Sequence, residues 1–316
     1  MDGDQAGRDT PRARRLMEHV RCNLCGADDV TLRFASTVQH RSDWRAFRCT
    51  HSGYGTHPPI VQCKRCGLIY TDPRPEGGHI LETYAAVEDP LYMEEREGRV
   101  LTFEHHLKPL EQITGPPGGR PLLDVGAYTG VFVDIAARHG WDAWGLEPSR
   151  WAVEEARARG LHMTLGTLEK ANLPQAHFDV VTMWDVIEHL TDPRSALEQT
   201  HGLLKPSGLL VVHTIDIDSL FARLMGPRWP WLMEMHIYYF SRRTLRSMLE
   251  TCGFQVLSDR PQGRYLRLGY LMNRVGALVP ALGHPAEWLV TKLGLRGRAV
   301  PVNLGDLFTA YARKEP

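Results

Sequence analysis

The sequence has no long hydrophobic run and no excess of charge of one sign. Among its 316 residues, Lys and Arg together number 37, and so do Asp and Glu. The apolar stretch 275–283 is too short to cross a bilayer, which takes about 20 residues, and it contains Pro280. Residues 1–21 are polar and Arg-rich, unlike a hydrophobic leader. These absences predict a cytoplasmic protein without a membrane span, and no nucleic acid is expected as a partner.

Cysteine is also scarce, and its placement argues against a disulfide framework. Four of the six cysteines stand in two C-x-x-C pairs, and each pair is followed by glycine. Two intervening residues let both thiolates of a pair reach one tetrahedral zinc ion at about 2.3 Å. The glycine permits a left-handed turn that aims amide N–H groups at the sulfurs. We predict a closed, structural zinc site whose ligands are Cys22, Cys25, Cys63 and Cys66.

Other readings of the cysteines carry less weight. A redox dithiol is normally a single pair beside a βαβ unit, and the duplicated glycine argues against it. Cys49, His51 and His57 lie between the two pairs, and we expect packed or solvated side chains there rather than ligands. Cys252 precedes a glycine in a helix-like segment and is expected in the core.

Breaker residues and composition divide the chain into five parts. The cluster 115–119, Gly-Pro-Pro-Gly-Gly, is the strongest boundary signal. The predicted parts are a flexible tail (1–20), a zinc-binding module (21–75), a helical linker (76–116), a core (117–260) and a C-terminal extension that completes the sheet (261–316).

From residue 120 onward, strand-like and helix-like segments alternate, which predicts an α/β fold with a doubly wound, mainly parallel sheet. The expected strands are 121–125, 142–146, 161–165, 178–184 and 208–215. The expected helices are 129–139, 149–159, 194–204 and 242–252. Segments 254–257 and 306–312 are expected to form an antiparallel hairpin at one sheet edge, and 264–300 is expected to be helical.

A nucleotide-binding turn follows the first of these strands. The order is Asp124-x-Gly126-x-Tyr128-x-Gly130, and the next strand ends at Glu147. Glycines let the backbone approach a ligand, and an acidic residue about 20 positions on can hold ribose hydroxyls. Dinucleotide enzymes instead use G-x-G-x-x-G to place a pyrophosphate on a helix N-terminus. The carboxylate inside the motif therefore favours a cofactor without phosphates.

The turn resembles motif I of the class I S-adenosylmethionine-dependent methyltransferases, which implies a Rossmann-like fold and that cofactor. The resemblance assigns Asp124 and the turn 126–130 to the methionine end, and Glu147 to the ribose diol. Tyr128 replaces the usual third glycine, so we expect a negative φ there. The implied cofactor-binding residues are Asp124, Gly126, Ala127, Tyr128, Gly130, Glu147, Thr167, Leu168 (which, with Thr167, flanks adenine) and Trp184 (at the end of the fourth strand).

The segment after the fourth strand contains a Glu188-His189 pair and an Asp192-Pro193 helix start, as in small-molecule members of that family. Methyl transfer is an in-line displacement, so positioning does much of the work and a base for the acceptor remains to be found. His189 is a candidate because an unperturbed imidazole has a pKa of about 6.5. The alternative for His189 is a capping or core histidine.

A second group of candidates lies in the segment 229–241, called here the insertion. It is rich in Trp, Tyr, Met and Pro and follows the fifth strand. Such a segment is either core or a lid over the strand ends that excludes water. In the second case Glu234, His236 and Tyr238 are candidates for substrate binding or proton transfer.

The order of parts is similar over nearly the whole chain to bacterial sugar C-methyltransferases, which act on nucleotide-linked deoxysugars. This resemblance implies methyl transfer to a sugar or natural-product intermediate, on carbon or oxygen. The alternatives are an RNA base methyltransferase with a zinc module and a scaffold that binds the cofactor without transfer. Residues 1–116 hold 15 basic against 17 acidic side chains, which disfavours RNA, whereas 261–316 hold 8 against 3. The acceptor and the oligomeric state stay open.

Overall fold

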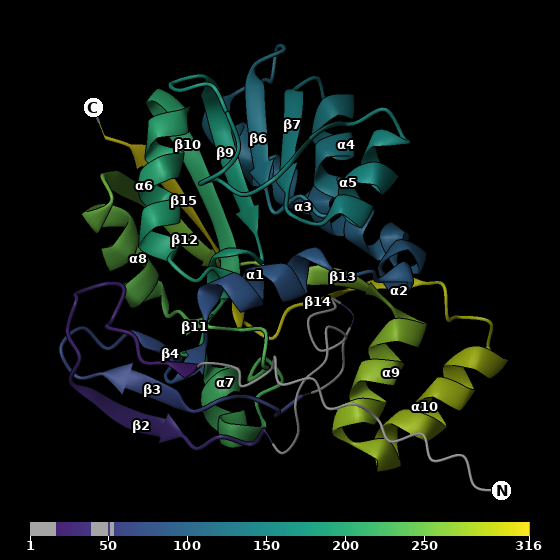
Figure 1. Cartoon of the computed structure of the whole chain (residues 1–316). Coiled ribbons are helices and arrows are strands. Elements are labelled where there is room, and N and C mark those ends of the chain that lie inside the picture. Colours follow the sequence, from purple (N-terminus) through teal and green to yellow (C-terminus); the bar gives the residue numbers. More distant parts are fainter. Residues whose placement is uncertain (1–16, 39–49, 51–53, 316) are drawn as a thin grey trace, which may run out of the picture.

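The computed structural model describes residues 17–38, 50 and 54–315, and its centre is a seven-stranded sheet (Figure 1). The strands lie in the order β12-β15-β10-β9-β6-β7-β8, and β15 alone runs antiparallel to its neighbours β10 and β12. Neighbouring pairs among β10, β9, β6, β7 and β8 are parallel. The strands are β6 (Pro121–Val125), β7 (Asp142–Glu147), β8 (His162–Leu165), β9 (Phe178–Trp184), β10 (Leu204–Ile215), β12 (Phe254–Pro261) and β15 (Leu307–Lys314).

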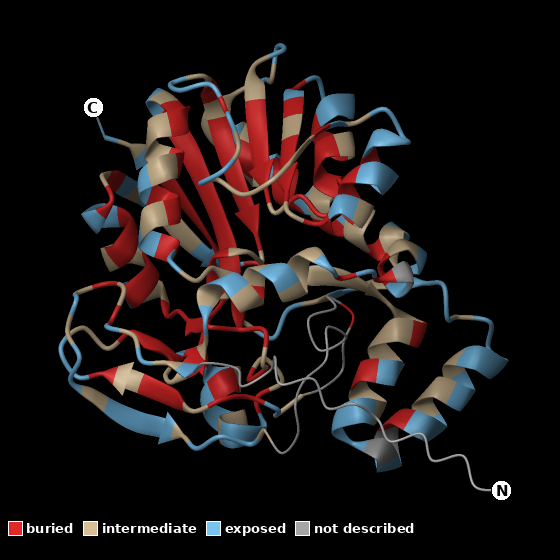
Figure 2. Ribbon diagram, viewed as in Figure 1, coloured by how far each residue is buried: buried red, intermediate tan, exposed pale blue. Residues whose placement is uncertain are grey.

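Helices cover both faces of this sheet because its strands are apolar on both sides. Leu122 and Val180 belong to one apolar cluster, with residues of α3 and α4, whereas their neighbours Leu123 and Val181 belong to a second cluster with residues of α6 and α8. Figure 2 shows the strands as the most continuously buried part of the molecule. The covering helices are α3 (Arg96–Thr114), α4 (Val131–Arg138), α5 (Arg150–Arg157), α6 (Pro193–Leu203) and α8 (Arg242–Thr251).

The predicted sheet is confirmed, and its last two strands form the expected antiparallel pair at one edge, with β12 outermost and β15 between β12 and β10. The segment between these strands was expected to be helical over 264–300, and this expectation is only partly met. The segment contains β13 (Arg264–Arg267), α9 (Leu268–Leu278), α10 (Pro280–Lys292) and β14 (Ala299–Val302), and β13 pairs with β14. The sequences of β13 and β14 show no apolar periodicity, so the two strands could not be predicted from the sequence.

The cysteine module, residues 21–75, forms a small antiparallel sheet in the order β11-β4-β3-β2. Its strands are β2 (Val30–Phe34), β3 (Ile60–Cys63) and β4 (Ile69–Thr71), and the fourth, β11 (Tyr238–Tyr239), comes from the insertion. The predicted tail 1–20 lies largely outside the described residues. Its end is ordered into β1 (Met17–Glu18), which pairs with β5 (Arg74–Pro75), and Arg74 Nε donates to Glu18 at 2.9 Å.

The linker predicted for 76–116 is helical as expected. It consists of α1 (Gly77–Ala85), α2 (Pro90–Glu94) and α3. In Figure 1 the arrowhead of β9 points toward a band formed by α1, β13 and β14, and the cysteine module and the α9–α10 pair lie beyond that band. The C-terminal ends of the parallel strands therefore face the other parts of the chain. None of the described helices combines the length and the apolar character that crossing a bilayer requires.

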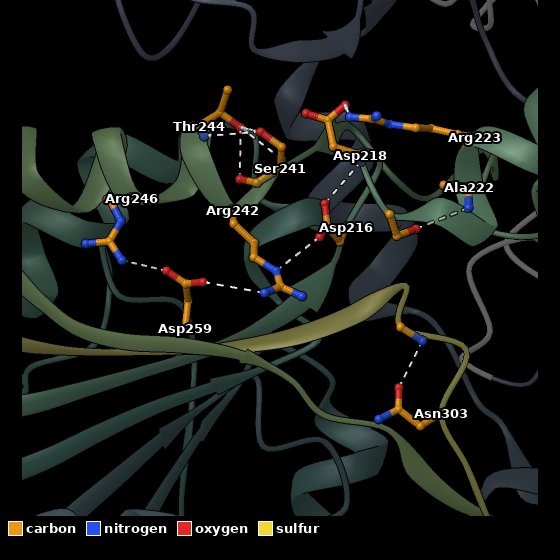
Figure 3. A network of polar contacts seen from close by, with 12 residues as sticks. Asp216, Asp218, Ala222, Arg223, Ser241, Arg242, Thr244, Arg246, Asp259 and Asn303 are labelled. Carbon is orange, nitrogen blue, oxygen red and sulfur yellow. Dashed lines mark hydrogen bonds and ion pairs between the residues drawn. The ribbon is translucent and has the colours of Figure 1, made fainter.

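A polar network fixes the chain where the insertion returns to the sheet (Figure 3). Arg242, at the start of α8, contacts Asp216 at 3.3 Å and Asp259 of β12 at 3.8 Å. Arg246, one turn later, contacts Asp259 at 2.6 Å. Ser241 caps α8 by accepting from the Thr244 amide, and the Thr244 hydroxyl accepts from the Ser241 amide. The end of the insertion is thus held against β12 and the residue that follows β10.

The other end of the insertion is anchored by one buried carboxylate. Trp229 and Trp231 both donate their indole N–H groups to Asp306, at 3.2 and 2.8 Å. Asp306 directly precedes β15 and is 5 % exposed. α7 (Leu220–Met225) lies between β10 and these tryptophans. The sheet therefore determines where the insertion begins.

Replacing Asp306 by Ala should remove two hydrogen bonds to a charged acceptor and leave two indole donors unsatisfied. At about 1.5–3 kcal/mol for each such bond, we expect the free energy of unfolding to fall by about 3 kcal/mol. Chemical denaturation of the purified chain measures this. Glu198→Ala, which breaks an exposed ion pair with Arg194 on α6, is the control and should cost less than about 1 kcal/mol. Equal losses in the two variants would contradict the assignment.

Candidate functional site

The glycine-bearing turn after β6 is held against the end of β7. The amides of Gly126 and Ala127 both donate to the Leu146 carbonyl, at 2.8 and 3.1 Å. Gly126 has a φ of 69°, and a Cβ added there would lie 2.6 Å from Val186 Cγ2. Gly130 (φ 71°) caps α4, and its Cβ would lie 2.7 Å from Leu161. A side chain at either glycine would therefore both strain the backbone and displace a neighbour.

Glu147 connects the two halves of this site. Its carboxylate accepts the Tyr128 amide at 2.9 Å and the Ser149 amide at 2.8 Å. Burial raises the pKa of Glu147 to about 7, although both hydrogen bonds act in the opposite direction. Each oxygen has a second lone pair, so the carboxylate can also accept two hydroxyl protons.

Asp124 lies at the base of the same turn and is 3 % exposed. It accepts the Thr182 hydroxyl of β9 at 2.6 Å. Burial raises the pKa of Asp124 to about 8, with a smaller contribution from the neighbouring Glu147. The turn is thus lined by two buried carboxyl groups that lack a cationic partner among the residues that the structure describes around them, which suits a ligand with a positive charge.

The backbone of Tyr128 corrects one expectation from the sequence. Its φ is +46°, not negative, so a bulky side chain occupies the left-handed conformation that glycine usually supplies. Such a conformation is uncommon for a large residue and needs support from its surroundings. Tyr92 of α2 packs edge-on against the Tyr128 ring, with ring centroids 4.5 Å apart, and the Glu147 carboxylate holds the Tyr128 amide.

Thr167, Leu168 and Trp184 border the same region. The Gly166 amide donates to the Glu147 carbonyl at 2.9 Å, which places Thr167 and Leu168 just beyond the end of β7. Thr167 Oγ1 and Trp184 Nε1 are buried and find no hydrogen-bond partner in the part of the chain that the structure describes. A buried polar group without a partner costs about 1–3 kcal/mol, so such groups call for a ligand or water.

Two predicted catalytic histidines, His189 and His236, come together at the end of β9. His189 closes the short 3-10 helix η2 (Ile187–His189), and the His236 ring centroid lies 4.8 Å from that of His189. Desolvation lowers the pKa of both imidazoles, that of His236 to about 3. The ordinary imidazole pKa of about 6.5, on which the choice of His189 as a base rested, is thus lowered by burial, and the sequence does not show how deeply a ring is buried. Both rings are therefore neutral at neutral pH, and burial makes each a weaker base than a free imidazole.

Glu234 and Tyr238, the other two candidates, are placed differently. Glu234 is half-buried in the insertion, two residues before His236. The Tyr238 hydroxyl lies 3.3 Å from Arg74 Nη1 and 3.4 Å from the Thr191 carbonyl, and burial raises the pKa of Tyr238 to about 12. These contacts join Tyr238 to the cysteine module and to the segment just before α6, not to the histidine pair.

A second pair of buried histidines was missed from the sequence. His106 of α3 and His213 of β10 have ring centroids 5.0 Å apart, and His106 lies 5.2 Å from the Trp184 ring. His106 Nε2 donates to the Gly263 carbonyl at 2.8 Å, which leaves Nδ1 as an acceptor. His106 Nδ1 and His213 Nε2 are buried without a hydrogen-bond partner in the described ranges. Segments more than 100 residues apart supply the two rings, so no local motif marks them.

Asp185 and Arg264 complete this end of the sheet. Arg264 of β13 contacts both Asp185 oxygens, at 3.1 and 3.2 Å, and lies over the Trp231 ring. His213 Nε2 is 3.7 Å from Asp185. The charge of Arg264, with the surrounding imidazoles, lowers the pKa of Asp185 despite its burial. Its φ of +55° is a further departure from ordinary strand geometry, as is common at functional sites.

The four predicted zinc ligands also come together. Cys22 Sγ lies 3.4 Å from Cys66 Sγ, Cys25 Sγ lies 3.5 Å from Cys63 Sγ, and all four sulfurs lie within 4.8 Å of one another. Sulfurs around tetrahedral zinc at about 2.3 Å lie about 3.8 Å apart. The residues therefore fit zinc. His57 instead bonds the Pro58 carbonyl at 2.8 Å, Cys252 is buried beside α8, and Cys49 and His51 lie outside the described residues.

Both cysteine pairs have the predicted turn geometry. Gly26 and Gly67 have φ values of 72° and 80°, and their amides donate to the carbonyls of Cys22 and Cys63 at 2.8 and 2.9 Å. A Cβ at Gly67 would collide with the Arg243 guanidinium, which donates to the Cys66 carbonyl at 3.0 Å. The second pair is therefore packed directly on α8.

Comparison with known proteins agrees with this geometry. A family model described as a methyltransferase domain matches residues 94–259, more than half of the chain. The chain belongs to the class I S-adenosylmethionine-dependent methyltransferases. The match includes the turn after β6, Glu147 and both His189 and His236, and it leaves out the cysteine module.

Curated relatives of this methyltransferase are similar over only part of their length. It is 32% identical over 124 residues to the ubiquinone biosynthesis O-methyltransferase of Alkalilimnicola ehrlichii. The aligned residues make up 35% of this chain and 50% of that protein. It is 34% identical over 116 residues to the mitochondrial ubiquinone biosynthesis O-methyltransferase of Schizosaccharomyces pombe, covering 34% and 42%. The chain thus spans about half the length of the curated relatives that it matches.

Among solved structures, the chain is similar to an S-adenosylmethionine-dependent methyltransferase of Thermotoga maritima. The TM-score is 0.47 with 23% sequence identity, and the match covers 75% of this chain and 99% of the other.

The two buried carboxyl groups predict a pH-dependent stability. A carboxyl whose pKa is raised by folding, from about 3.9 for Asp, is favoured in its protonated form in the folded protein. The free energy of unfolding should then fall as the pH rises from about 4 to the folded pKa of Asp124, about 8. Asp124→Asn keeps the acceptor for Thr182 but cannot ionise. Between about pH 5.5 and pH 7.5 it should therefore lose less stability than the parent, by up to about 2.7 kcal/mol.

Urea denaturation at the two pH values measures this difference. Asp142→Asn, an exposed position at the start of β7, is the matched control and should show the slope of the parent. Parallel pH dependence in the parent and in Asp124→Asn would show that Asp124 does not titrate in this range.

Proposed function

We propose that this methyltransferase transfers a methyl group from S-adenosylmethionine to a small-molecule acceptor, a nucleotide-linked sugar or other natural-product intermediate. The observation that carries the proposal is the Glu147 carboxylate, fixed by the Tyr128 amide at the end of β7. A buried acceptor in this position suits the ribose diol, and Asp124 and the turn 126–130 suit the methionine end. The bound cofactor supplies an electrophilic methyl group on a positively charged sulfur.

Other groups in the site support that cofactor. Thr167 and Leu168 follow β8, beside the end of β7, and can flank the adenine. The Thr167 hydroxyl, which has no partner among the described residues, would gain one there. Trp184 offers a buried indole N–H at the end of β9. Two carboxyl groups in a buried site favour a cationic ligand over an anionic dinucleotide, because a nearby positive charge stabilises their ionised form and a negative charge does not.

We propose an oxygen atom as the methyl acceptor, since the curated relatives are named O-methyltransferases. The histidines at the ends of β9 and β10 can take the acceptor proton. Their low pKa values leave them neutral at pH 7, so each has a free lone pair. Trp184 and the apolar side chains around it exclude water from the same region.

We further propose structural zinc at the four cysteines. Four thiolates close the coordination shell, so the ion would have no open position for a substrate. Its role would be to hold β3, β4 and the two knuckles together, and through β4 to support β11 of the insertion.

The purified chain should contain about one tightly held zinc ion per molecule. Structural zinc contributes about 10–16 kcal/mol in peptide models, so Cys63→Ser should unfold the cysteine module. Metal analysis and the melting temperature measure the two effects. Cys252→Ser, which alters a buried cysteine outside the group, should keep its zinc. Zinc-free parent protein, with Cys63→Ser equally stable, would refute the site.

Glu147→Ala should weaken binding of S-adenosylhomocysteine by at least about tenfold, because each bond to the charged group is worth about 1.5–3 kcal/mol. Glu155→Ala, on the exposed part of α5, is the control. Calorimetry measures both. Methyl transfer is then tested with radiolabelled S-adenosylmethionine against deoxysugar nucleotides and phenols. Unchanged affinity in Glu147→Ala, or tighter binding of NAD, would overturn the cofactor assignment. Solvent deuterium entering an acceptor carbon would show C-methylation instead.

A further inference from the structure

Three potential metal ligands meet at the end of β9, apart from the four cysteines. They are Glu188 and His189 of η2 and His236 of the insertion. One nitrogen of each imidazole and one Glu188 oxygen all lie within 4.8 Å of one another. The Ile237 amide donates to the Glu188 carbonyl at 2.8 Å, so the two segments that supply the ligands are joined by the backbone.

Both histidines have the orientation that a metal requires. His189 Nδ1 lies 2.8 Å from the Met235 carbonyl, and His236 Nδ1 lies 2.8 Å from the Trp231 carbonyl. A carbonyl can only accept, so Nδ1 of each ring carries the hydrogen and Nε2 keeps its lone pair. Metal-binding histidines typically donate their other N–H to just such a carbonyl.

Glu188 is oriented in the same way. Its Oε2 accepts the Thr214 hydroxyl of β10 at 2.9 Å, and the residue is 1 % exposed. Asp185 also lies near the end of β9, but it is paired with Arg264 at 3.1 Å. This pairing occupies its carboxylate and neutralises the arginine, whose charge would otherwise oppose a bound cation. Two imidazole lone pairs and one carboxylate thus lie close together, and the residues that supply them are buried or half-buried.

We propose that Glu188, His189 and His236 bind a divalent transition-metal ion. Two imidazoles and one carboxylate favour Zn²⁺, Fe²⁺, Co²⁺ or Ni²⁺ over Mg²⁺ and Ca²⁺, which prefer oxygen ligands. Three protein ligands leave a position open, in contrast to the closed four-cysteine centre.

The open position gives the metal a role in the proposed methyl transfer, on which this step rests. It would take the acceptor hydroxyl oxygen and lower its pKa, as metals do for bound water. The O–H bond breaks and its proton passes to His213 Nε2, which is buried without a hydrogen-bond partner in the described part of the chain. The oxygen then forms the new bond to the methyl carbon, and the carbon–sulfur bond breaks with its electron pair remaining on sulfur. His189 and His236 are ligands in this scheme rather than bases.

Cobalt titration of the full-length protein tests the site without cofactor or acceptor. The protein is first stripped of weakly held metal on a chelating resin, and zinc analysis confirms that the cysteine zinc remains. We expect one Co²⁺ to bind per chain, giving visible d–d bands without thiolate charge-transfer absorption. Proton NMR should show two paramagnetically shifted exchangeable signals, from the Nδ1–H groups that bond Met235 and Trp231.

Glu188→Gln and His236→Gln should each weaken cobalt binding by about a hundredfold or more. Mutating residues that only hydrogen-bond a metal ligand already lowers metal affinity by about 10–100-fold. His213→Gln, a buried histidine at the same sheet end, is the matched control and should bind cobalt as the parent does. No saturable cobalt binding in the parent, or equal affinity in all three variants, would overturn the proposal. If a ligand variant fails to fold, the NMR signals of the parent decide alone: two shifted exchangeable signals support the site and their absence refutes it.

The outcome is separate from that of the proposed function. Cobalt binding in a protein that does not bind S-adenosylhomocysteine would support the metal site and refute the cofactor. Cofactor binding without cobalt binding would refute only the metal site.

Discussion

The pairing of β11 with β4 is the contact on which the positions of η2 and the insertion depend. It joins Tyr238 to Tyr70 and Tyr239 to Ile69, so a two-residue strand from the insertion becomes part of the cysteine-module sheet. Backbone bonds continue the connection, because Thr71 donates to the Ile237 carbonyl and Ile237 donates to Glu188. The position of η2 relative to the insertion is therefore fixed through the module and not by the large sheet alone.

Burial explains the electrostatics of both halves of the site. Desolvation is the largest influence on Asp124, Glu147 and His236, and it favours the neutral form of each. Asp185 is the exception, because the adjacent Arg264 keeps it ionised. The site thus places carboxyl groups at the turn after β6 and neutral imidazoles at the ends of β9 and β10. This difference suits a positively charged donor on one side and the loss of an acceptor proton on the other.

The sequence predicted the parts that depend on local pattern. Alternating apolar runs located β6 to β10 within a few residues, and the cysteine spacing brought four sulfurs together. It failed where distant segments meet. His106, His213 and Arg264 come from α3, β10 and β13, and each has a chemical environment that only the folded chain creates. The predicted negative φ of Tyr128 was wrong for a related reason. Its left-handed φ is supported by contacts with Glu147 and Tyr92 rather than by the propensity of tyrosine itself.

The small module and the insertion cannot be understood as independent units. β2 is largely exposed, with Leu32 at 60% exposure, whereas Ile60 and Ile69 are buried with Trp229, Leu232 and Tyr239 of the insertion. A module of this size buries too little apolar surface to be stable alone, and metal ligation commonly compensates for that. The insertion in turn is held by the module on one side and by Asp306 of the sheet on the other. His236 lies between these two anchors, so the structural cysteine centre and the sheet jointly determine where its ring can meet His189.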